Sequence, residues 1–157
     1  MLGHLQAHLW GKVVILGIGN TLRSDDGAGS ILAARLKNKT SFLALDAGPN
    51  PENYLGKIIQ EKPDNIVIID AVDLDISPGE FRVLEAQDVN TTHLFSTHNA
   101  SIALTINYLQ SNLRTDIIIL FIQPKSIAFG DNLSSEVSSA LDKLEEFFLQ
   151  AGDEKKG

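Results

Sequence analysis

The chain contains no cysteine. This absence excludes a disulfide framework, a thiolate metal site and a cysteine nucleophile. The 157 residues include no apolar run near the ~20 residues that a membrane-spanning helix needs, so we expect no membrane insertion. Lysine and arginine total 13 against 20 acidic residues, for a net charge of -7, and they form no basic stripe. Because a nucleic-acid binder needs cationic contacts to phosphate, nucleic acid is not an expected partner.

The first residues also lack the charged, apolar and small-residue segments of a secretory signal peptide. We therefore expect a cytoplasmic protein. The composition, 43% hydrophobic and 21% charged, is that of a globular protein. The length predicts a single domain over residues 1–157, with an N-terminal extension at 1–11 and a frayed polar tail at 151–157. Within the extension, Leu2, Leu5 and Leu9 share one face of a short expected helix.

Short apolar runs alternate with segments of helical period along the chain. The runs at residues 13–17, 42–45, 66–69 and 117–122 predict strands buried on both faces. The helical stripes predict helices at 26–37, 51–61, 98–113 and 134–150. Residues 80–85 alternate with period two, which is typical of an edge strand. This order predicts a three-layer α/β/α sandwich, with a mainly parallel sheet of about five strands and one antiparallel edge strand.

Acidic residues follow three of the predicted strands. Asp26 lies in the loop after the first strand, and Asp46 and Asp70 end the second and third. Open parallel sheets place their functional sites beyond the carboxyl ends of their strands. One aspartate there is commonly a turn former or a helix cap. Three at three strand ends exceed what turn chemistry requires, so this edge is the predicted site.

A histidine, His98, begins the helix that should start at the same edge of the sheet. Together with Asp26 and Asp70 it offers two carboxylates and one imidazole. That set suits a catalytic divalent ion with open coordination positions. We therefore predict that these three residues converge on a metal and carry the chemistry. His93, in a polar loop, is a weaker candidate.

Several common catalytic patterns are absent. The glycine-rich loop after the first strand opens like a dinucleotide fingerprint, but Leu22 stands where the last glycine belongs. Asp25 and Asp26 follow, and their negative charge would repel a phosphate. The chain contains neither an H-E-x-x-H motif nor a Gly-x-Ser-x-Gly elbow. A hydrolytic reaction would therefore depend on a metal-bound carbonyl or water.

Six segments, in order along the chain, resemble the signature of the hydrogenase maturation proteases. They are GIGNTLRSDDGAG at residues 17–29, DAG at 46–48, IIDAVD at 68–73, SPGE at 77–80, STHN at 96–99 and IQPK at 122–125. They span nearly the whole chain. The pattern is most similar to the members that process hydrogenase-3-type large subunits.

The resemblance implies an endopeptidase that removes the C-terminal extension of a nickel-loaded [NiFe]-hydrogenase large-subunit precursor. It implies that Asp26, Asp70 and His98 contact the metal, and that Asp46 lies near the cleft. Nickel would be delivered with the substrate, although another divalent metal could bind in vitro. Whether a protein carboxylate or a metal-bound hydroxide is the base stays open.

Two other interpretations also remain open at this point. A peptidase of the same fold with another protein substrate, like the spore germination proteases, would need no hydrogenase precursor. A non-enzymatic α/β domain that binds a small ligand at the same cleft would have no cleavage activity to lose.

Overall fold

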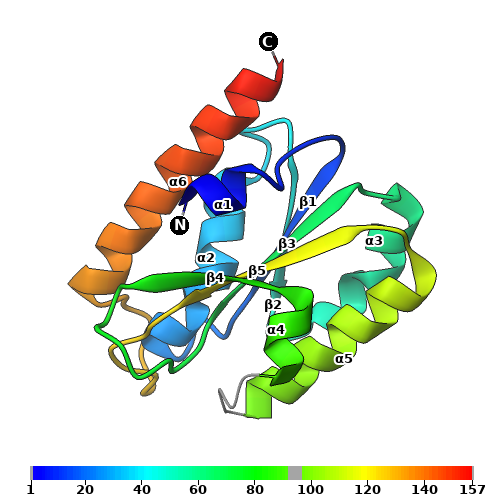
Figure 1. Cartoon of the computed structure of the whole chain (residues 1–157). Helices are drawn as coiled ribbons and strands as arrows, with labels where there is room; N and C mark the ends of the chain where they lie inside the picture. The colour runs from blue at the N-terminus through cyan, green and yellow to red at the C-terminus, as the bar shows by residue number, and fades with distance from the viewer. Residues whose placement is uncertain (1, 92–96, 157) are drawn as a thin grey trace.

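The computed structural model describes residues 2–91 and 97–156, and the side chains of all of these except 90, 91, 97–101 and 154–156. Within the described residues, five strands form one sheet in the order β2-β1-β3-β5-β4 (Figure 1). The strands are β1 Val13–Ile18, β2 Leu43–Gly48, β3 Asn65–Ala71, β4 Phe81–Glu85 and β5 Asp116–Ile122. All neighbours pair in parallel except β4, which pairs antiparallel with β5 at the edge. The predicted sheet is confirmed.

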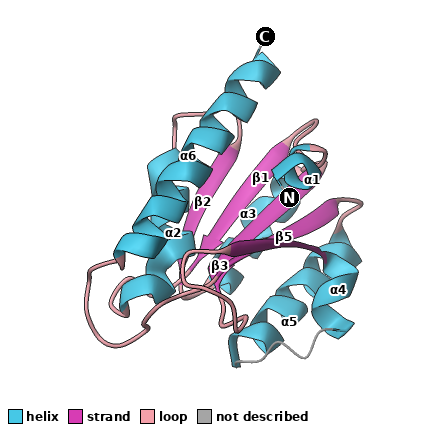
Figure 2. Cartoon of the chain, turned by 60° about the vertical axis from the view of Figure 1, so that its left-hand side comes forward, coloured by secondary structure: helices cyan, strands magenta, loops and turns pink. Residues whose placement is uncertain are grey.

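Helices cover both faces of this sheet (Figure 2). They are α1 Leu2–Gln6, α2 Ala28–Leu36, α3 Leu55–Glu61, α4 Ala86–Thr91, α5 Thr97–Asn112 and α6 Ser135–Lys156, with 3-10 turns η1 Ser24–Gly27 and η2 Pro51–Tyr54. Side chains from α1, α2 and α6 share one core cluster, and those from α3, α4 and α5 share the other. The three-layer sandwich is therefore confirmed.

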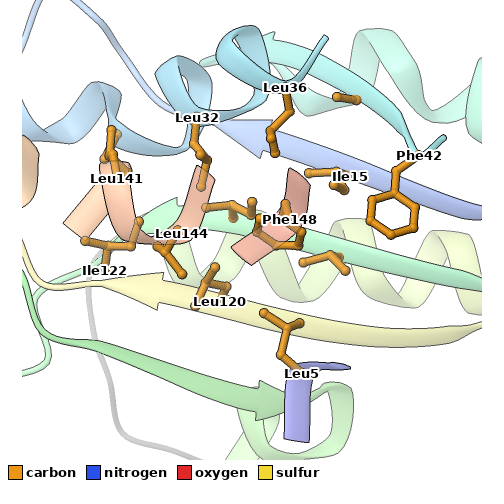
Figure 3. Packing of buried hydrophobic residues seen from close by; sticks show 14 of the residues in the cluster. Leu5, Ile15, Leu32, Leu36, Phe42, Leu120, Ile122, Leu141, Leu144 and Phe148 are labelled. Carbon is orange, nitrogen blue, oxygen red and sulfur yellow. The ribbon is translucent and has the colours of Figure 1, made fainter. Parts of the chain in front are cut away.

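The central strand β3 shows why the apolar runs are continuous. Val67 and Ile69 belong to the cluster under α2 and α6, whereas Ile66 and Ile68 belong to the cluster under α5. Successive side chains of a strand point to opposite faces, so a strand between two helical layers needs apolar residues at every position. Figure 3 shows the first cluster, in which Phe148 of α6 lies fully buried.

The structure differs from the sequence expectations at the ends of several elements. The segments expected as the first two helices each begin with a 3-10 turn, η1 or η2, and α4 was not predicted. The tail expected to fray from residue 151 is helical through Lys156. Gly152 is buried there, and its carbonyl accepts a hydrogen bond from Ser41 Oγ at 3.3 Å. A Cβ at Gly152 would lie 2.8 Å from Thr40 Cβ. These tertiary contacts extend α6 past the amphipathic stripe.

Among the described residues, every helix falls short of the length or apolar character that crossing a bilayer requires.

Candidate active site at the carboxyl end of the sheet

Glycines allow the loop after β1 to lie directly against the end of β3. A Cβ on Gly29 would clash with the carbonyl oxygen of Ile69, and one on Gly19 would clash with the carbonyl oxygen of Asp26. Only a residue without a side chain permits such close backbone approach. The η1 turn, which carries Asp26, is therefore held against the strand that carries Asp70.

Replacing Gly29 with alanine is expected to lower the free energy of unfolding by about 1–3 kcal/mol, because the methyl group would force backbone apart. Gly56→Ala is the matched control, since Gly56 is an exposed helical glycine whose added Cβ would meet nothing within 4 Å. It should be neutral or stabilising by about 0.5–1 kcal/mol. Urea unfolding of the two variants measures the difference, and equal stabilities would contradict this account.

Asp26 and Asp70 line the same cavity, whose volume is about 140 Å³. Its other lining residues are Ile18, Gly19, Asn20, Arg23 and Pro49. Both aspartates are almost fully buried, with exposed fractions of 5% and 3%. The structure thus brings together two of the three residues predicted to bind the metal, although they lie 44 positions apart in the sequence.

The carboxylate oxygens of Asp26 and Asp70 differ in their hydrogen-bond partners. Asp26 Oδ2 accepts a hydrogen bond from the Asn20 backbone at 3.2 Å. Asp70 Oδ1 accepts one from the Ala71 backbone at 2.8 Å. Asp70 Oδ2 is buried and has no hydrogen-bond partner among the described residues. A buried carboxylate oxygen without a partner is costly, and a cation is one ligand that could offset that cost.

Burial raises the pKa of Asp70 well above its ordinary value, and the nearby charge of Asp26 raises this pKa further. The hydrogen bond from the Ala71 backbone opposes both effects but is the smallest of the three. Two buried acids that repel each other favour the binding of a proton or a metal cation between them. The donor set therefore fits a divalent ion.

The third predicted residue, His98, lies in the first turn of α5, and its side chain lies outside the described set. Because α5 leads into the parallel strand β5, its first turn lies at the carboxyl end of the sheet. The helix also packs through Ile102 and Ile106 on the face that contains Ile68, and Asp70 belongs to that same face by alternation. His93 lies outside the described residues.

The site and the fold match a known group of enzymes. A sequence model of the hydrogenase maturation protease family matches residues 28–151, which is most of the chain. The chain belongs to this family. The chain is 33% identical to the hydrogenase 3 maturation protease of Escherichia coli K12 over 136 aligned residues. The alignment covers 83% of this chain and 85% of the Escherichia coli protein. This chain is therefore a peptidase that acts in hydrogenase maturation, and the non-enzymatic alternative is excluded.

Solved structures agree with this assignment. The crystal structure of the [NiFe] hydrogenase maturation protease HycI from Thermococcus kodakarensis is similar at a TM-score of 0.86 and 30% identity, covering 96% of this chain and 99% of that one. The solution structure of the endopeptidase HycI from Escherichia coli has a TM-score of 0.78 at 29% identity, with coverage of 88% and 90%.

Asp46 does not join the other two acids in the protease. Its carboxylate accepts hydrogen bonds from Ser30 Oγ in α2 and, at 3.1 Å, from the Gly48 backbone. Asp46 lies two residues after Ala44 in β2, so both side chains point to the same face of the sheet, the one covered by α2 and α6. Asp70 projects from the opposite face. Asp46 lines a separate cavity with Tyr54 and Lys57. In the sheet register Asp46 is level with Gly17 and Ile69, one residue before Asp70, and this offset of one residue puts the two carboxylates on opposite faces.

Asp25, the neighbour of Asp26, has a structural role instead. Its fully buried carboxylate accepts hydrogen bonds from the backbone of Lys125 at 2.8 Å and of Ser126 at 3.3 Å. It also accepts one from the Ser134 backbone and one from Ser134 Oγ, both at 2.8 Å. Asp25 therefore fastens the loop between β5 and α6 over η1. Adjacent acids in the sequence point into different parts of the protease.

Gln123 is a supporting residue whose contacts the sequence did not reveal. Its Oε1 accepts a hydrogen bond from the Leu74 backbone at 2.6 Å, and its Nε2 donates to Asp73 Oδ1 at 3.2 Å. It holds the loop after β3 against the end of β5. With Asp26 and Pro124, it lines a second cavity of about 230 Å³. The IQPK segment is therefore part of the rim beside Asp26.

Proposed function

We propose that this protease removes the C-terminal extension of a [NiFe]-hydrogenase large-subunit precursor that already carries nickel, and that it acts in the cytoplasm. The observation that carries the proposal is the pair of buried carboxylates at one cavity, of which Asp70 Oδ2 has no partner among the described residues. A divalent cation that entered with the substrate would satisfy this oxygen and relieve the repulsion between Asp26 and Asp70.

Asp26, Asp70 and His98 are the proposed metal contacts. Carboxylate and imidazole ligands suit nickel, and three protein ligands leave coordination positions for groups of the precursor. So sparse a set binds an ion weakly unless the substrate supplies further ligands. Cleavage would then wait until the precursor has received its nickel, because the protease would recognise the metal as part of its substrate.

The chemistry would be hydrolysis of one peptide bond. Nickel carried by the precursor can polarise the scissile carbonyl as a Lewis acid. Asp26 and Asp70 would hold that region of the precursor in place, and a carboxylate oxygen not engaged by the ion can accept a proton from the attacking water. The water oxygen adds to the carbonyl carbon, and the departing amine takes up a proton as the C–N bond breaks.

The decisive experiment is incubation of the purified protease with a nickel-loaded large-subunit precursor, followed by intact-mass spectrometry. The expected result is loss of a C-terminal peptide from the nickel-loaded precursor and no loss from the nickel-free precursor. Precursors of the hydrogenase-3 type are the first to test, given the identity with the Escherichia coli enzyme.

His98→Ala should reduce cleavage by about 10²-fold or more if the imidazole contacts the metal or the reacting groups. No trimming by the intact protease, with the precursor shown to be cleavable by a cognate enzyme, would remove the substrate assignment. Cleavage of nickel-free precursor at the same rate would remove the metal-dependent recognition.

A further inference from the structure

A second cluster of potential metal ligands lies where the N-terminal segment meets the edge of the sheet. It consists of His4 in α1, His8 just after that helix, and Glu85 at the end of β4. One ligand atom from each of the three side chains lies within 4.8 Å of the other two. Both histidines precede residues 28–151, which the family model matches, and lie in none of the six signature segments.

The helical turn of the N-terminal segment brings the two histidines together. His4 and His8 are four residues apart, and the backbone N–H of His8 donates to the Leu5 carbonyl at 3.0 Å. The helical turn therefore continues far enough to place both imidazoles on one side, with ring centroids 5.3 Å apart. Leu5 and Leu9 anchor the segment in the core, as Figure 3 shows for Leu5 beside the end of β4.

The distances to Glu85 are close to those of a metal shell. Glu85 Oε1 lies 3.6 Å from His4 Nε2 and 3.8 Å from His8 Nε2. Ligand atoms around a tetrahedral zinc ion are about 3.3 Å apart, given metal–ligand distances near 2.0 Å. Small side-chain rotations would close the difference. The other carboxylate oxygen of Glu85 accepts a hydrogen bond from Gln87 Nε2 at 2.9 Å, which orients Oε1 toward the histidines.

We propose that His4, His8 and Glu85 form a second metal site for a late first-row divalent ion such as Zn²⁺ or Ni²⁺. This site is separate from the cavity lined by Asp26 and Asp70, here called the catalytic cavity. Two imidazoles and one carboxylate are borderline ligands that favour these ions over Mg²⁺ or Ca²⁺. The side chains are 49%, 20% and 38% exposed, so an ion can reach them and a water can fill the fourth position.

The site is remote from the catalytic cavity. Glu85 pairs with Ile118 in the first half of β5, whereas Asp70 pairs with Phe121 near its end. Three residues along a strand correspond to about 10 Å. In addition, α1 packs in the cluster under α2 and α6, on the face opposite Asp70. An ion bound here would join the N-terminal segment to the edge strand β4 and would lie outside the cavity that Asp26 and Asp70 line.

The test is zinc binding to tag-free protease that has been treated with a chelator. Isothermal titration with ZnCl₂ alone is expected to show one zinc ion bound in the wild type, and no binding at this site in the His4→Gln/His8→Gln variant. Glu85→Gln should weaken zinc binding at least about tenfold, since even outer contacts of metal sites contribute that much. Zinc should raise the Tm of the wild type but not that of the double variant.

The Asp70→Asn/His98→Gln variant is the control for the catalytic cavity. It should still bind one zinc ion at the second site, and zinc should still raise its Tm. Far-UV circular dichroism of the metal-free variants establishes that each is folded. Equal zinc affinity in the wild type and the His4→Gln/His8→Gln variant would overturn the proposal, as would no zinc binding by the wild type up to about 1 mM. The cluster would then be only two histidine–carboxylate pairs.

Discussion

Replacing Asp70 with asparagine is expected to reduce precursor cleavage strongly and, at neutral pH, to stabilise the fold. Activity should fall about 10²-fold or more, because the proposed metal contact loses its charge. Stability should rise because Asp70 is buried, lies near the charge of Asp26 and has one carboxylate oxygen without a partner among the described residues. Asparagine has nearly the same shape as aspartate, but it carries no negative charge to repel that of Asp26. Opposite effects on activity and stability are typical of a residue retained for function.

The stabilisation by Asp70→Asn should depend on pH in a defined direction. The pKa of Asp70 is raised in the folded protein, so below its unfolded pKa of about 3.9 the group is neutral in both states and imposes no charge penalty. As the pH rises through the raised folded pKa, the wild type loses stability that the variant does not lose. The Tm difference should therefore be small near pH 4 and grow toward neutral pH.

Calorimetric Tm values between about pH 4 and pH 8 measure this difference. Asp116→Asn is the matched control, because Asp116 is exposed at the opposite end of the neighbouring strand β5. It should leave Tm nearly unchanged at every pH. A lower Tm for Asp70→Asn at pH 7, or a difference independent of pH, would contradict the account of the buried acid pair.

Replacing Asp25 with alanine is expected to cause the largest loss of stability among the aspartate variants, on the order of 3–5 kcal/mol, since each buried donor left unpaired costs about 1–3 kcal/mol. The substitution would leave three backbone N–H groups and the Ser134 hydroxyl without the acceptor they share. Hydrogen bonds to a charged acceptor contribute more than neutral ones, and buried donors left unpaired add their desolvation penalty. The loop between β5 and α6 would still accept the hydrogen bonds that Ser24 and the Asp25 backbone donate to it, but it would lose those to the Asp25 carboxylate, so η1 would be held less firmly. Cleavage would fall because Asp26 lies on η1.

Urea unfolding, together with hydrogen exchange at residues 124–134, measures this effect. Asp131→Asn lies in the same loop but is exposed, so it should change stability by less than about 0.5 kcal/mol. A small effect of Asp25→Ala, equal to that of Asp131→Asn, would show that the four hydrogen bonds do not hold the loop. A uniform increase in hydrogen exchange across the whole chain, with no larger increase at residues 124–134, would also show that these hydrogen bonds do not hold the loop.

Much of the fold could be predicted because its signals are local. The continuous apolar run of β3 required burial on both faces, and the period-two alternation of residues 80–85 identified the edge strand, which spans Phe81–Glu85. The ends of elements were less predictable. The extension of α6 beyond residue 150 depends on the packing of Gly152 against Thr40 and Ser41, which are more than 100 positions away in the sequence.

The candidate site was predictable to the extent that chain order specifies a sheet edge. Asp26 and Asp70 meet at one cavity, as expected of acids that follow adjacent parallel strands. Asp46 is level with Gly17 and Ile69, one residue before the level of Asp70, so it projects to the opposite face, toward Ser30. Proximity to a strand end in the sequence does not specify the face, because a difference of one residue in register moves a side chain to the other face.

The sequence by itself determined the layered α/β/α order, the family and the edge of the sheet at which its acids gather, because apolar period and motif order are properties of the chain alone. Tertiary structure decided which acid does what. Asp25 binds a loop about 100 residues away, Asp26 faces Asp70, and His4 and His8 meet Glu85. These pairings depend on side-chain direction and on contacts between distant segments, which exist only once the sheet has formed.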